Sequence, residues 1–149
     1  MNKIVVVDAS IALKWAITEA DSKTARALLA EWVNQGVEIK APALLAYEIT
    51  NILYREVRAG RISSDTAKIG IKLIFRTVKL VLSKNSSFNI RAMALAEHYG
   101  LPASYGAHYL AFAEQQGCEL WTSDTRLWRS VKGQLDWVRT LESYSPSSS

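Results

Sequence analysis

Two aspartates follow apolar, strand-like runs, a position from which side chains in many α/β proteins do chemistry. Asp8 follows Ile4–Val7, and Asp124 follows Glu119–Thr122. Because the carboxyl ends of parallel strands meet at one edge of a sheet, we expect both carboxylates to project from that edge. Clustered carboxylates repel one another unless a cation joins them, and Mg²⁺ and Mn²⁺ prefer oxygen ligands. The pattern favours a divalent metal site that activates water and stabilises charge on a phosphate.

A third acid, Glu48, lies on the helix predicted after the second strand. Asn51 follows three residues later and therefore shares its helical face, which predicts a polar pair facing a cleft. Each acid also has a simpler explanation. Asp8 and Asp124 are suited to capping the helices that they precede, and Glu48 is suited to a solvated or salt-bridged position.

The elements that position these acids alternate along the chain. Short β-branched or alternating runs predict strands, and capping residues, terminal glycines and helical spacing predict the helices between them. Pro42 is expected at the start of the helix that carries Glu48. This order is typical of a doubly wound α/β fold with a parallel sheet. The predicted strands are 4–7, 37–40, 78–82, 119–122 and 137–139, and the principal helices are 21–35, 43–59, 63–77, 86–100 and 104–116.

Length and composition predict one folded domain. The chain has 149 residues, of which 49% are hydrophobic and 21% charged, as in ordinary globular proteins. No apolar stretch is long enough to cross a membrane, and the Met1-Asn2-Lys3 start has no cleavable signal pattern, so we expect a cytoplasmic protein. Cys118 is the single cysteine, which excludes an internal disulfide.

Positive charge is concentrated in one segment. The chain carries a formal charge of +4, and the segment 55–84 holds eight basic residues against two acidic ones. Helical spacing along this segment predicts a face that follows a phosphate backbone; the alternative is a merely solvated helix surface. The candidate residues for binding a nucleic-acid backbone are Arg55, Arg58, Arg61, Lys68, Lys72 and Arg76.

Three motifs occur in order around the acids: Val6-Val7-Asp8-Ala9-Ser10, Tyr-Glu-Ile-Thr-Asn-Ile-Leu at 47–53, and Leu-Trp-Thr-Ser-Asp-Thr-Arg-Leu at 120–127. Together they resemble a PIN domain and, more narrowly, the VapC-type toxin ribonucleases of prokaryotes, over about residues 3–140. The resemblance implies a three-layer α/β/α fold with a central parallel sheet of four to five strands. The domain is expected to span 1–142, followed by a disordered tail at 143–149.

The same resemblance implies roles for individual residues and partners. Asp8, Glu48 and Asp124 correspond to acids that bind Mg²⁺ or Mn²⁺ for hydrolysis of RNA phosphodiesters. Three polar positions match residues that orient these acids or bound water. A homodimer and a cognate antitoxin, whose apolar segment docks near the first helix, are also implied. The three polar positions are Ser10, Asn51 and Thr122.

One position departs from this pattern. Where the family normally reads Tyr-Asp-Ala, this chain reads Tyr105-Gly106-Ala107, so an expected metal ligand is missing. Gly106 also loses the roughly 0.3–1 kcal/mol that an aspartate gains in the first turn of a helix. Glu97 and Glu114 are not placed to substitute for it. The sequence therefore predicts an impaired ribonuclease.

Two other functions remain open. One is a degenerate, non-catalytic PIN module that binds RNA or an antitoxin, and Gly106 favours it. The other is a flavodoxin-like receiver or phosphotransfer domain with Asp8 as the phosphoacceptor. The second alternative has less support, because it would need paired acids and a suitably placed late lysine, and neither is evident in the sequence.

Overall fold

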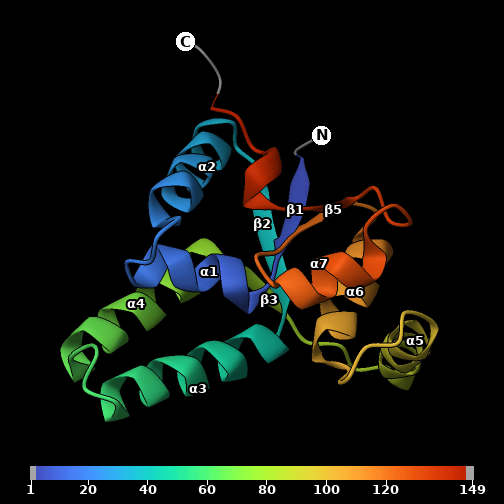
Figure 1. Ribbon diagram of the computed structural model, residues 1–149, viewed down its shortest axis with the longest axis horizontal. Helices are drawn as coiled ribbons and strands as arrows, with labels where there is room; N and C mark the ends of the chain where they lie inside the picture. Colours follow the sequence, from blue (N-terminus) through green and yellow to red (C-terminus); the bar gives the residue numbers. More distant parts are fainter. Residues whose placement is uncertain (1–2, 147–149) are drawn as a thin grey trace.

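A five-stranded parallel sheet forms the centre of the structure, a computed structural model that describes residues 3–146 (Figure 1). The strand order is β3-β2-β1-β4-β5, and every neighbouring pair is parallel. This arrangement confirms the predicted three-layer fold with a central parallel sheet. The strands are β1 (Ile4–Val7), β2 (Glu38–Pro42), β3 (Lys79–Val81), β4 (Glu119–Trp121) and β5 (Val138–Arg139).

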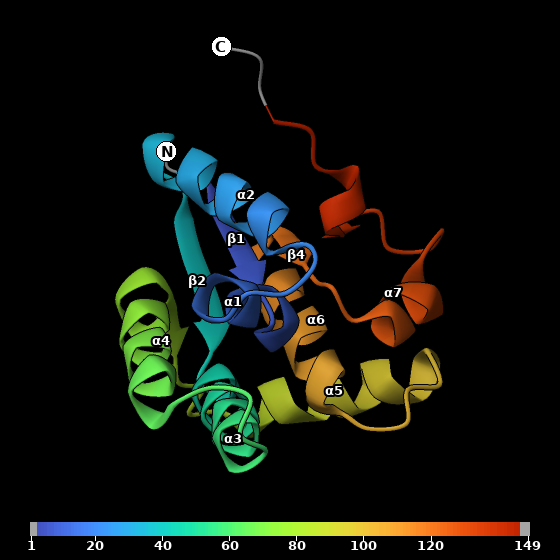
Figure 2. The ribbon, with the colours of Figure 1, turned by 60° about the vertical axis from the view of Figure 1, so that its left-hand side comes forward.

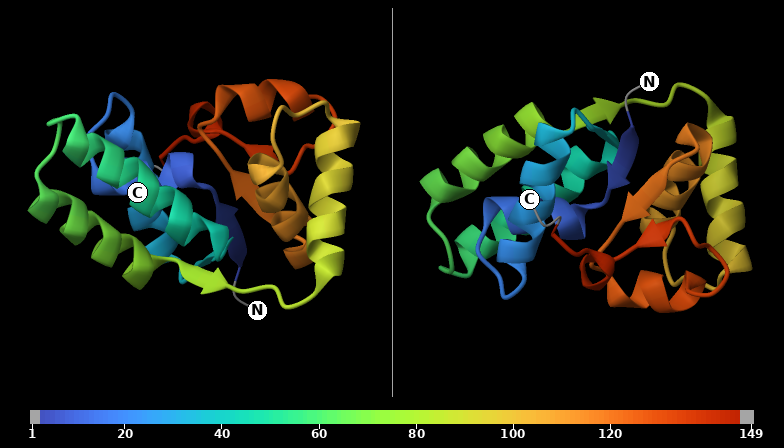
Figure 3. Two further views of the ribbon diagram at one scale, coloured as in Figure 1. Left: turned by 90° about the horizontal axis from the view of Figure 1, so that it is seen from below. Right: turned by 90° about the horizontal axis from the view of Figure 1, so that it is seen from above.

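Helices cover both faces of the sheet, which separates two helical groups in Figure 3. On one face α1, α3 and α4 contact β1, β2 and β3 respectively, and α2 packs on α1. On the other face α6 contacts β1, β2 and β4, and α5 packs against α6. The helices are α1 (Ala9–Ala16), α2 (Ser22–Asn34), α3 (Leu44–Arg58), α4 (Ser64–Thr77), α5 (Ser86–His98), α6 (Tyr105–Gln116) and α7 (Thr125–Val131).

The central position of β1 explains its composition. Val5, Val6 and Val7 are fully buried, because helices cover both faces of the strand and β2 and β4 flank its edges. A strand buried on both sides reads as a continuous apolar run, so the prediction from Ile4–Val7 is confirmed. Asp8 directly follows this buried strand, so its carboxylate lies where a negative charge is unfavourable.

Most helix boundaries follow capping signals in the sequence. Ser63 caps α4 by accepting a hydrogen bond from the Thr66 backbone N–H at 3.0 Å. Gly117 ends α6 in the left-handed conformation, with φ of 64°. The prediction for Pro42 was wrong, because Pro42 ends β2 and α3 begins at Leu44. Proline is tolerated there because the next residue, Ala43, supplies the backbone N–H that bonds Val81 at 3.0 Å.

The carboxyl-terminal segment forms a short 3-10 helix, η1 (Leu141–Ser143), whose Leu141 packs in the core. The predicted disordered tail at 143–149 therefore begins inside η1, and its residues 147–149 lie outside the described residues. Between residues 3 and 146, no helix is both long and apolar enough to cross a membrane.

Helices α1 and α4 approach closely at a glycine. A Cβ added to Gly70 would lie 2.8 Å from the Ala16 Cβ, which is closer than two carbon atoms can pack. Because α3 and α4 lie side by side as a hairpin (Figure 2), this contact helps to hold both helices against α1. Gly70 is thus required by packing, although glycine is a poor helix former.

We predict that Gly70→Ala lowers the free energy of unfolding by about 1–2 kcal/mol, since overpacking outweighs the gain in helix propensity. Urea denaturation measures the change. Ile69→Ala, at a neighbouring side chain that is 67% exposed, serves as control and should change stability by less than about 0.5 kcal/mol. Adding Ala16→Gly to Gly70→Ala should restore part of the loss. A Gly70→Ala protein as stable as the parent would contradict the proposed contact.

Candidate active site

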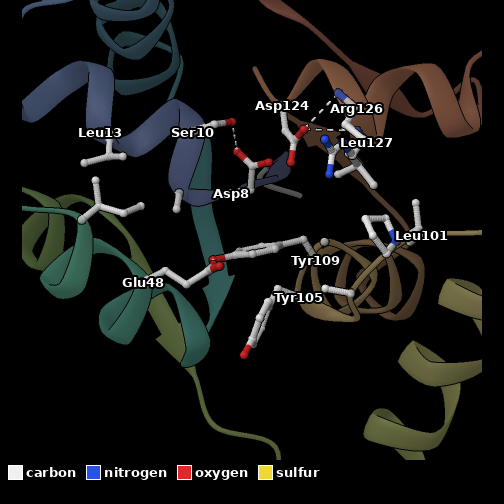
Figure 4. A pocket seen from close by; sticks show the side chains of 15 residues that line it. Asp8, Ser10, Leu13, Glu48, Leu101, Tyr105, Tyr109, Asp124, Arg126 and Leu127 are labelled. Atoms are coloured by element: carbon white, nitrogen blue, oxygen red, sulfur yellow. Dashed lines mark hydrogen bonds between the residues drawn. The ribbon is translucent and has the colours of Figure 1, made fainter. Parts of the chain in front are cut away.

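A cavity of about 380 Å³ lies at the carboxyl edge of the sheet, where the ends of β1 and β4 meet α3 and the first turns of α6 and α7 (Figure 4). All three predicted acids, Asp8, Glu48 and Asp124, line it. Aliphatic and aromatic side chains form most of the remaining wall, and the single basic residue of the lining is Arg126. The parallel sheet thus brings together acids that are far apart in the sequence.

Asp8 is held at the end of β1 by three hydrogen bonds. Its Oδ1 accepts from the Ser10 hydroxyl at 2.5 Å and from the Ile11 backbone N–H at 3.3 Å. Its Oδ2 accepts from the hydroxyl of Thr122, which follows β4. Asp8 therefore caps α1, as the simpler explanation expected, and also faces the cavity with only 5% of its surface exposed.

Asp124 stands beside this network at the start of α7. Its Oδ1 caps the helix by accepting from the backbone N–H groups of Arg126 at 3.0 Å and Leu127 at 3.2 Å. Its own backbone N–H donates to the Thr122 hydroxyl at 3.0 Å. The Thr122 side chain, fully buried, therefore links the two aspartates. In the described residues, Asp124 Oδ2 has no such partner and remains available to a ligand.

Glu48 enters the cavity from α3 and is fixed by a residue that sequence reasoning missed. The hydroxyl of Tyr109, on α6, donates to Glu48 Oε1 at 2.5 Å. Figure 4 shows the Tyr109 ring extending across the cavity to reach it. Glu48 is half-buried and forms no ion pair in the described residues, so the salt-bridged alternative is not observed. Tyr109 gave no sequence signal beyond its place on the same helix as Gly106, three residues later.

The electrostatics reflect negative charge held out of water. The pKa of Asp8 is raised to about 6, mainly by burial and to a smaller extent by the Asp124 charge, against the opposing hydrogen bonds from Ser10 and Thr122. Burial also raises the pKa of Glu48, and Asp124 adds to that rise. Burial and the neighbouring Glu48 carboxylate raise the pKa of Tyr109, which keeps its hydroxyl protonated as a donor. The site would therefore gain from a nearby positive charge.

Some predicted residues lie elsewhere. Asn51 is exposed and lines a separate hollow on α3 and α4, together with Tyr47, Tyr54 and Phe75, so the structure does not pair it with Glu48 in the cavity. The candidate RNA-binding residues are all exposed on α3, α4 and the loop between them. One of them, Arg61, is engaged in an ion pair with Glu56 at 2.6 Å.

Gly106 lies in the cavity wall, where the resemblance expects an aspartate. A Cβ at this position would lie 3.3 Å from Leu127 Cδ1 and 3.5 Å from its Cδ2. Leu127 is itself buried, so a side chain at 106 requires it to move by a few tenths of an ångström. The leucine therefore packs against the space from which a fourth acid would extend.

The chemistry of the donors fits a hard divalent cation. Carboxylate and hydroxyl oxygens are the ligands that Mg²⁺ and Mn²⁺ prefer, and a cation would offset the repulsion between Asp8 and Asp124. The arrangement is nevertheless incomplete, because within residues 3–146 no three His, Cys, Asp or Glu side chains are close enough to hold one metal ion. Asp8 and Asp124 are the candidate ligands, and Glu48 faces them from the other wall.

We predict that Asp8→Asn stabilises the metal-free protein at neutral pH. Because burial raises the pKa of Asp8 in the folded state from its ordinary 3.8 to about 6, its stability contribution is complete below about pH 4 and is lost as pH rises through 6. The asparagine variant should therefore exceed the parent by up to about 3 kcal/mol at pH 7–8, and by little at pH 4. Urea denaturation in EDTA at several pH values measures the difference. A difference independent of pH would contradict the burial of a charged Asp8.

Comparison with known proteins gives a consistent family assignment. The chain is 30% identical over 126 residues to ribonuclease VapC3 of Pyrobaculum aerophilum, covering 84% of this chain and 92% of the relative. It is 30% identical over 111 residues to exonuclease VapC9 of the same organism, covering 74% and 80%.

Solved structures share the fold at lower identity. A Pyrobaculum aerophilum protein matches with a TM-score of 0.69 at 24% identity, covering 95% of this chain and 93% of that one. The toxin-antitoxin complex from Klebsiella pneumoniae matches with a TM-score of 0.64 at 16% identity, covering 92% and 97%. Residues 5–133 match the family model described as PIN domain. This match covers most of the chain, and the chain belongs to the PIN domain family.

Proposed function

We propose that this protein is a metal-dependent endoribonuclease, the toxin of a toxin-antitoxin pair, that hydrolyses RNA phosphodiesters. The observation that carries the proposal is the cavity in which Asp8 and Asp124 lie beside each other and Glu48 faces them. The names of the two relatives, a ribonuclease and an exonuclease, support nuclease activity. The lack of a second aspartate beside Asp8 argues against the phosphotransfer alternative.

The residues of the site have separable tasks in this proposal. Mg²⁺ or Mn²⁺, when bound, would supply charge stabilisation at the phosphate and a more acidic water. Asp8 and Asp124 would hold the cation, and the hydroxyls of Ser10 and Thr122 fix the Asp8 carboxylate at both oxygens. Tyr109 fixes Glu48, which leaves Oε2 as the oxygen free to hold or orient a water.

Gly106 is expected to weaken this machinery. The proposed fourth ligand is absent, and the three acids present do not converge closely enough to bind a metal together in the described residues. We therefore expect weak metal affinity and slow cleavage by this chain. The alternative function is a non-catalytic PIN module that binds RNA or an antitoxin, and the same Gly106 favours it.

An antitoxin is the proposed protein partner, docking an apolar segment near α1. Structural neighbours described as a toxin-antitoxin complex from Klebsiella pneumoniae and as VapBC2 from Rickettsia felis support this partner. We also propose a homodimer in the cytoplasm. The exposed aromatic hollow formed by Tyr47, Tyr54 and Phe75 offers an apolar surface for a protein contact.

We predict that Gly106→Asp strengthens Mn²⁺ binding and accelerates RNA cleavage, each by about tenfold or more, because a further carboxylate joins the site. Gly106→Asn is the matched control, since it demands the same movement of Leu127 but adds no charge. Calorimetric titration of Mn²⁺ and cleavage of RNA with and without EDTA provide the measurements.

The double variant with Asp8→Asn separates the two functions. Cleavage by Gly106→Asp that is lost with Asp8→Asn identifies a disabled nuclease. If the parent itself cleaves RNA, and Asp8→Asn in the parent abolishes that cleavage, then three acids suffice. If neither the parent nor Gly106→Asp cuts RNA or binds Mn²⁺ more tightly than Gly106→Asn, the nuclease proposal fails and the binding module replaces it.

The exposed basic residues of α4 are proposed to contact the RNA backbone. Replacing Lys68, Lys72 and Arg76 by glutamine should reduce the salt dependence of single-stranded RNA binding, with the log–log slope falling by about 2. Fluorescence anisotropy in EDTA measures it. Replacing Lys23 and Arg26 on α2 is the control and should leave the slope unchanged. Equal slopes for all three proteins would mean that the α4 face is merely solvated.

A further inference from the structure

The cavity wall contains one position that supplies no ligand. Gly106 lines the cavity, whose acids are Asp8, Glu48 and Asp124. Asp8 and Asp124 lie beside each other, but within residues 3–146 no third His, Cys, Asp or Glu is close enough to share a metal ion with them. Mg²⁺ and Mn²⁺ take about six oxygen ligands. A cation held by these two carboxylates alone therefore keeps open coordination positions that a further oxygen donor could fill.

The space beside Gly106 suits a small anion better than an attached side chain. The cavity holds about 380 Å³, whereas one water molecule takes about 30 Å³ in the liquid, so formate fits in it. A side chain at 106 must place its Cβ 3.3 Å from Leu127 Cδ1, because that atom is bonded to the backbone. A free carboxylate has no such tether. It can approach Gly106 and still keep an ordinary van der Waals distance from Leu127.

Positive charge near this gap favours an anion. Arg126 is the single basic residue of the lining, and its guanidinium forms no ion pair or hydrogen bond in the part of the chain that the structure describes. Figure 4 shows it beside Asp124. Helix α6 begins one residue before Gly106, Ser104 makes no capping hydrogen bond, and the first turn holds no acid. The partial positive charge of this helix start is therefore not offset by a side chain.

The three carboxylates of the lining make this anion dependent on a cation. Without a cation they would repel a fourth carboxylate, so the metal-free protein is not expected to bind one. A divalent cation between Asp8 and Asp124 attracts the anion and gains an oxygen ligand from it. The two binding events are therefore coupled, and each ligand raises the affinity for the other by the same factor.

We infer that a small carboxylate anion from solution binds beside Gly106 and completes, with Asp8 and Asp124, the ligand set for a divalent cation. This inference rests on the proposed ribonuclease function and adds a small-molecule co-ligand to it. Formate reproduces the carboxylate of the missing aspartate without the carbon that would press on Leu127. The weak metal site of this chain is then dependent on the carboxylates in its surroundings.

Mn²⁺ binding in equal concentrations of sodium chloride or sodium formate tests the inference without cleavage. Electron paramagnetic resonance of free Mn²⁺ measures the affinity. Formate should tighten Mn²⁺ binding by the parent about tenfold or more, within the usual range of coupling between two ligands. Formate that binds Mn²⁺ in solution lowers the free ion equally for every variant, so it does not affect the comparison between variants.

Two variants at the gap show where formate binds. Gly106→Ala puts a methyl group in the gap and should reduce the formate effect to within about twofold; alanine favours the helix, and circular dichroism checks the fold. Gly106→Asp carries its own carboxylate, so it should bind Mn²⁺ more tightly than the parent in chloride and gain nothing from formate. Asp8→Asn should weaken Mn²⁺ binding in both salts, because it removes a ligand on which both proposals depend.

Each outcome bears on one proposal or on both. An unchanged Mn²⁺ affinity of the parent in formate would overturn the inference, while tighter binding by Gly106→Asp would leave the ribonuclease proposal standing. A formate effect of the same size in Gly106→Ala or Gly106→Asp would also overturn it, because the anion would then bind elsewhere. If neither the parent nor Gly106→Asp binds Mn²⁺ in either salt, the metal-dependent function fails together with the inference.

Discussion

The parallel pairing of β1 with β4 is the constraint from which the site follows. Val7 lies opposite Trp121, so both strands end at the same level and the residues after them share one edge. Asp8 donates its backbone N–H to the Trp121 carbonyl at 3.3 Å, and its side chain accepts from Thr122. A shift of this register would separate the two aspartates and break the Thr122 bridge between them.

This constraint also explains the chemical tension of the site. A strand buried on both faces delivers Asp8 into an environment that disfavours its charge, and Asp124 adds a second negative charge nearby. Hydrogen bonds from Ser10 and Thr122 offset part of the cost. Natural proteins retain such costly groups mainly where they serve function, which is consistent with a cation or a substrate as the missing partner. Because position 106 carries a glycine instead of an acid, the repulsion among the carboxylates of the site is smaller. The expected affinity for a cation is lower for the same reason.

Much of this arrangement could be predicted from the sequence. Period, capping residues and terminal glycines identified the strands and the principal helices, and the rule for parallel sheets brought Asp8 and Asp124 to one edge. Glu48 reached the cavity as expected because α3 follows β2 directly. These features depend on local patterns and on strand order, both of which can be predicted from the amino-acid sequence.

Other features depend on packing between distant side chains, which carries no local signal. The bond from Tyr109 to Glu48 joins residues 61 positions apart, and the contact of Leu127 with Gly106 arises from the approach of α7 to α6. Asn51 was expected in the cavity from helical spacing alone. It lies instead in the hollow with Tyr54, because three residues are less than one full helical turn from Glu48. Pro42 was misplaced because a proline is equally compatible with a strand end and a helix start.

The central claim is that the ends of β1 and β4 form one cation site. A crystal structure of the protein soaked in Mn²⁺, with anomalous scattering recorded at the manganese edge, tests it most directly. The account predicts an anomalous peak between the carboxylates of Asp8 and Asp124, within about 2.0–2.6 Å of an oxygen from each. Manganese bound only elsewhere, or no peak between these two residues at saturating Mn²⁺, would contradict it.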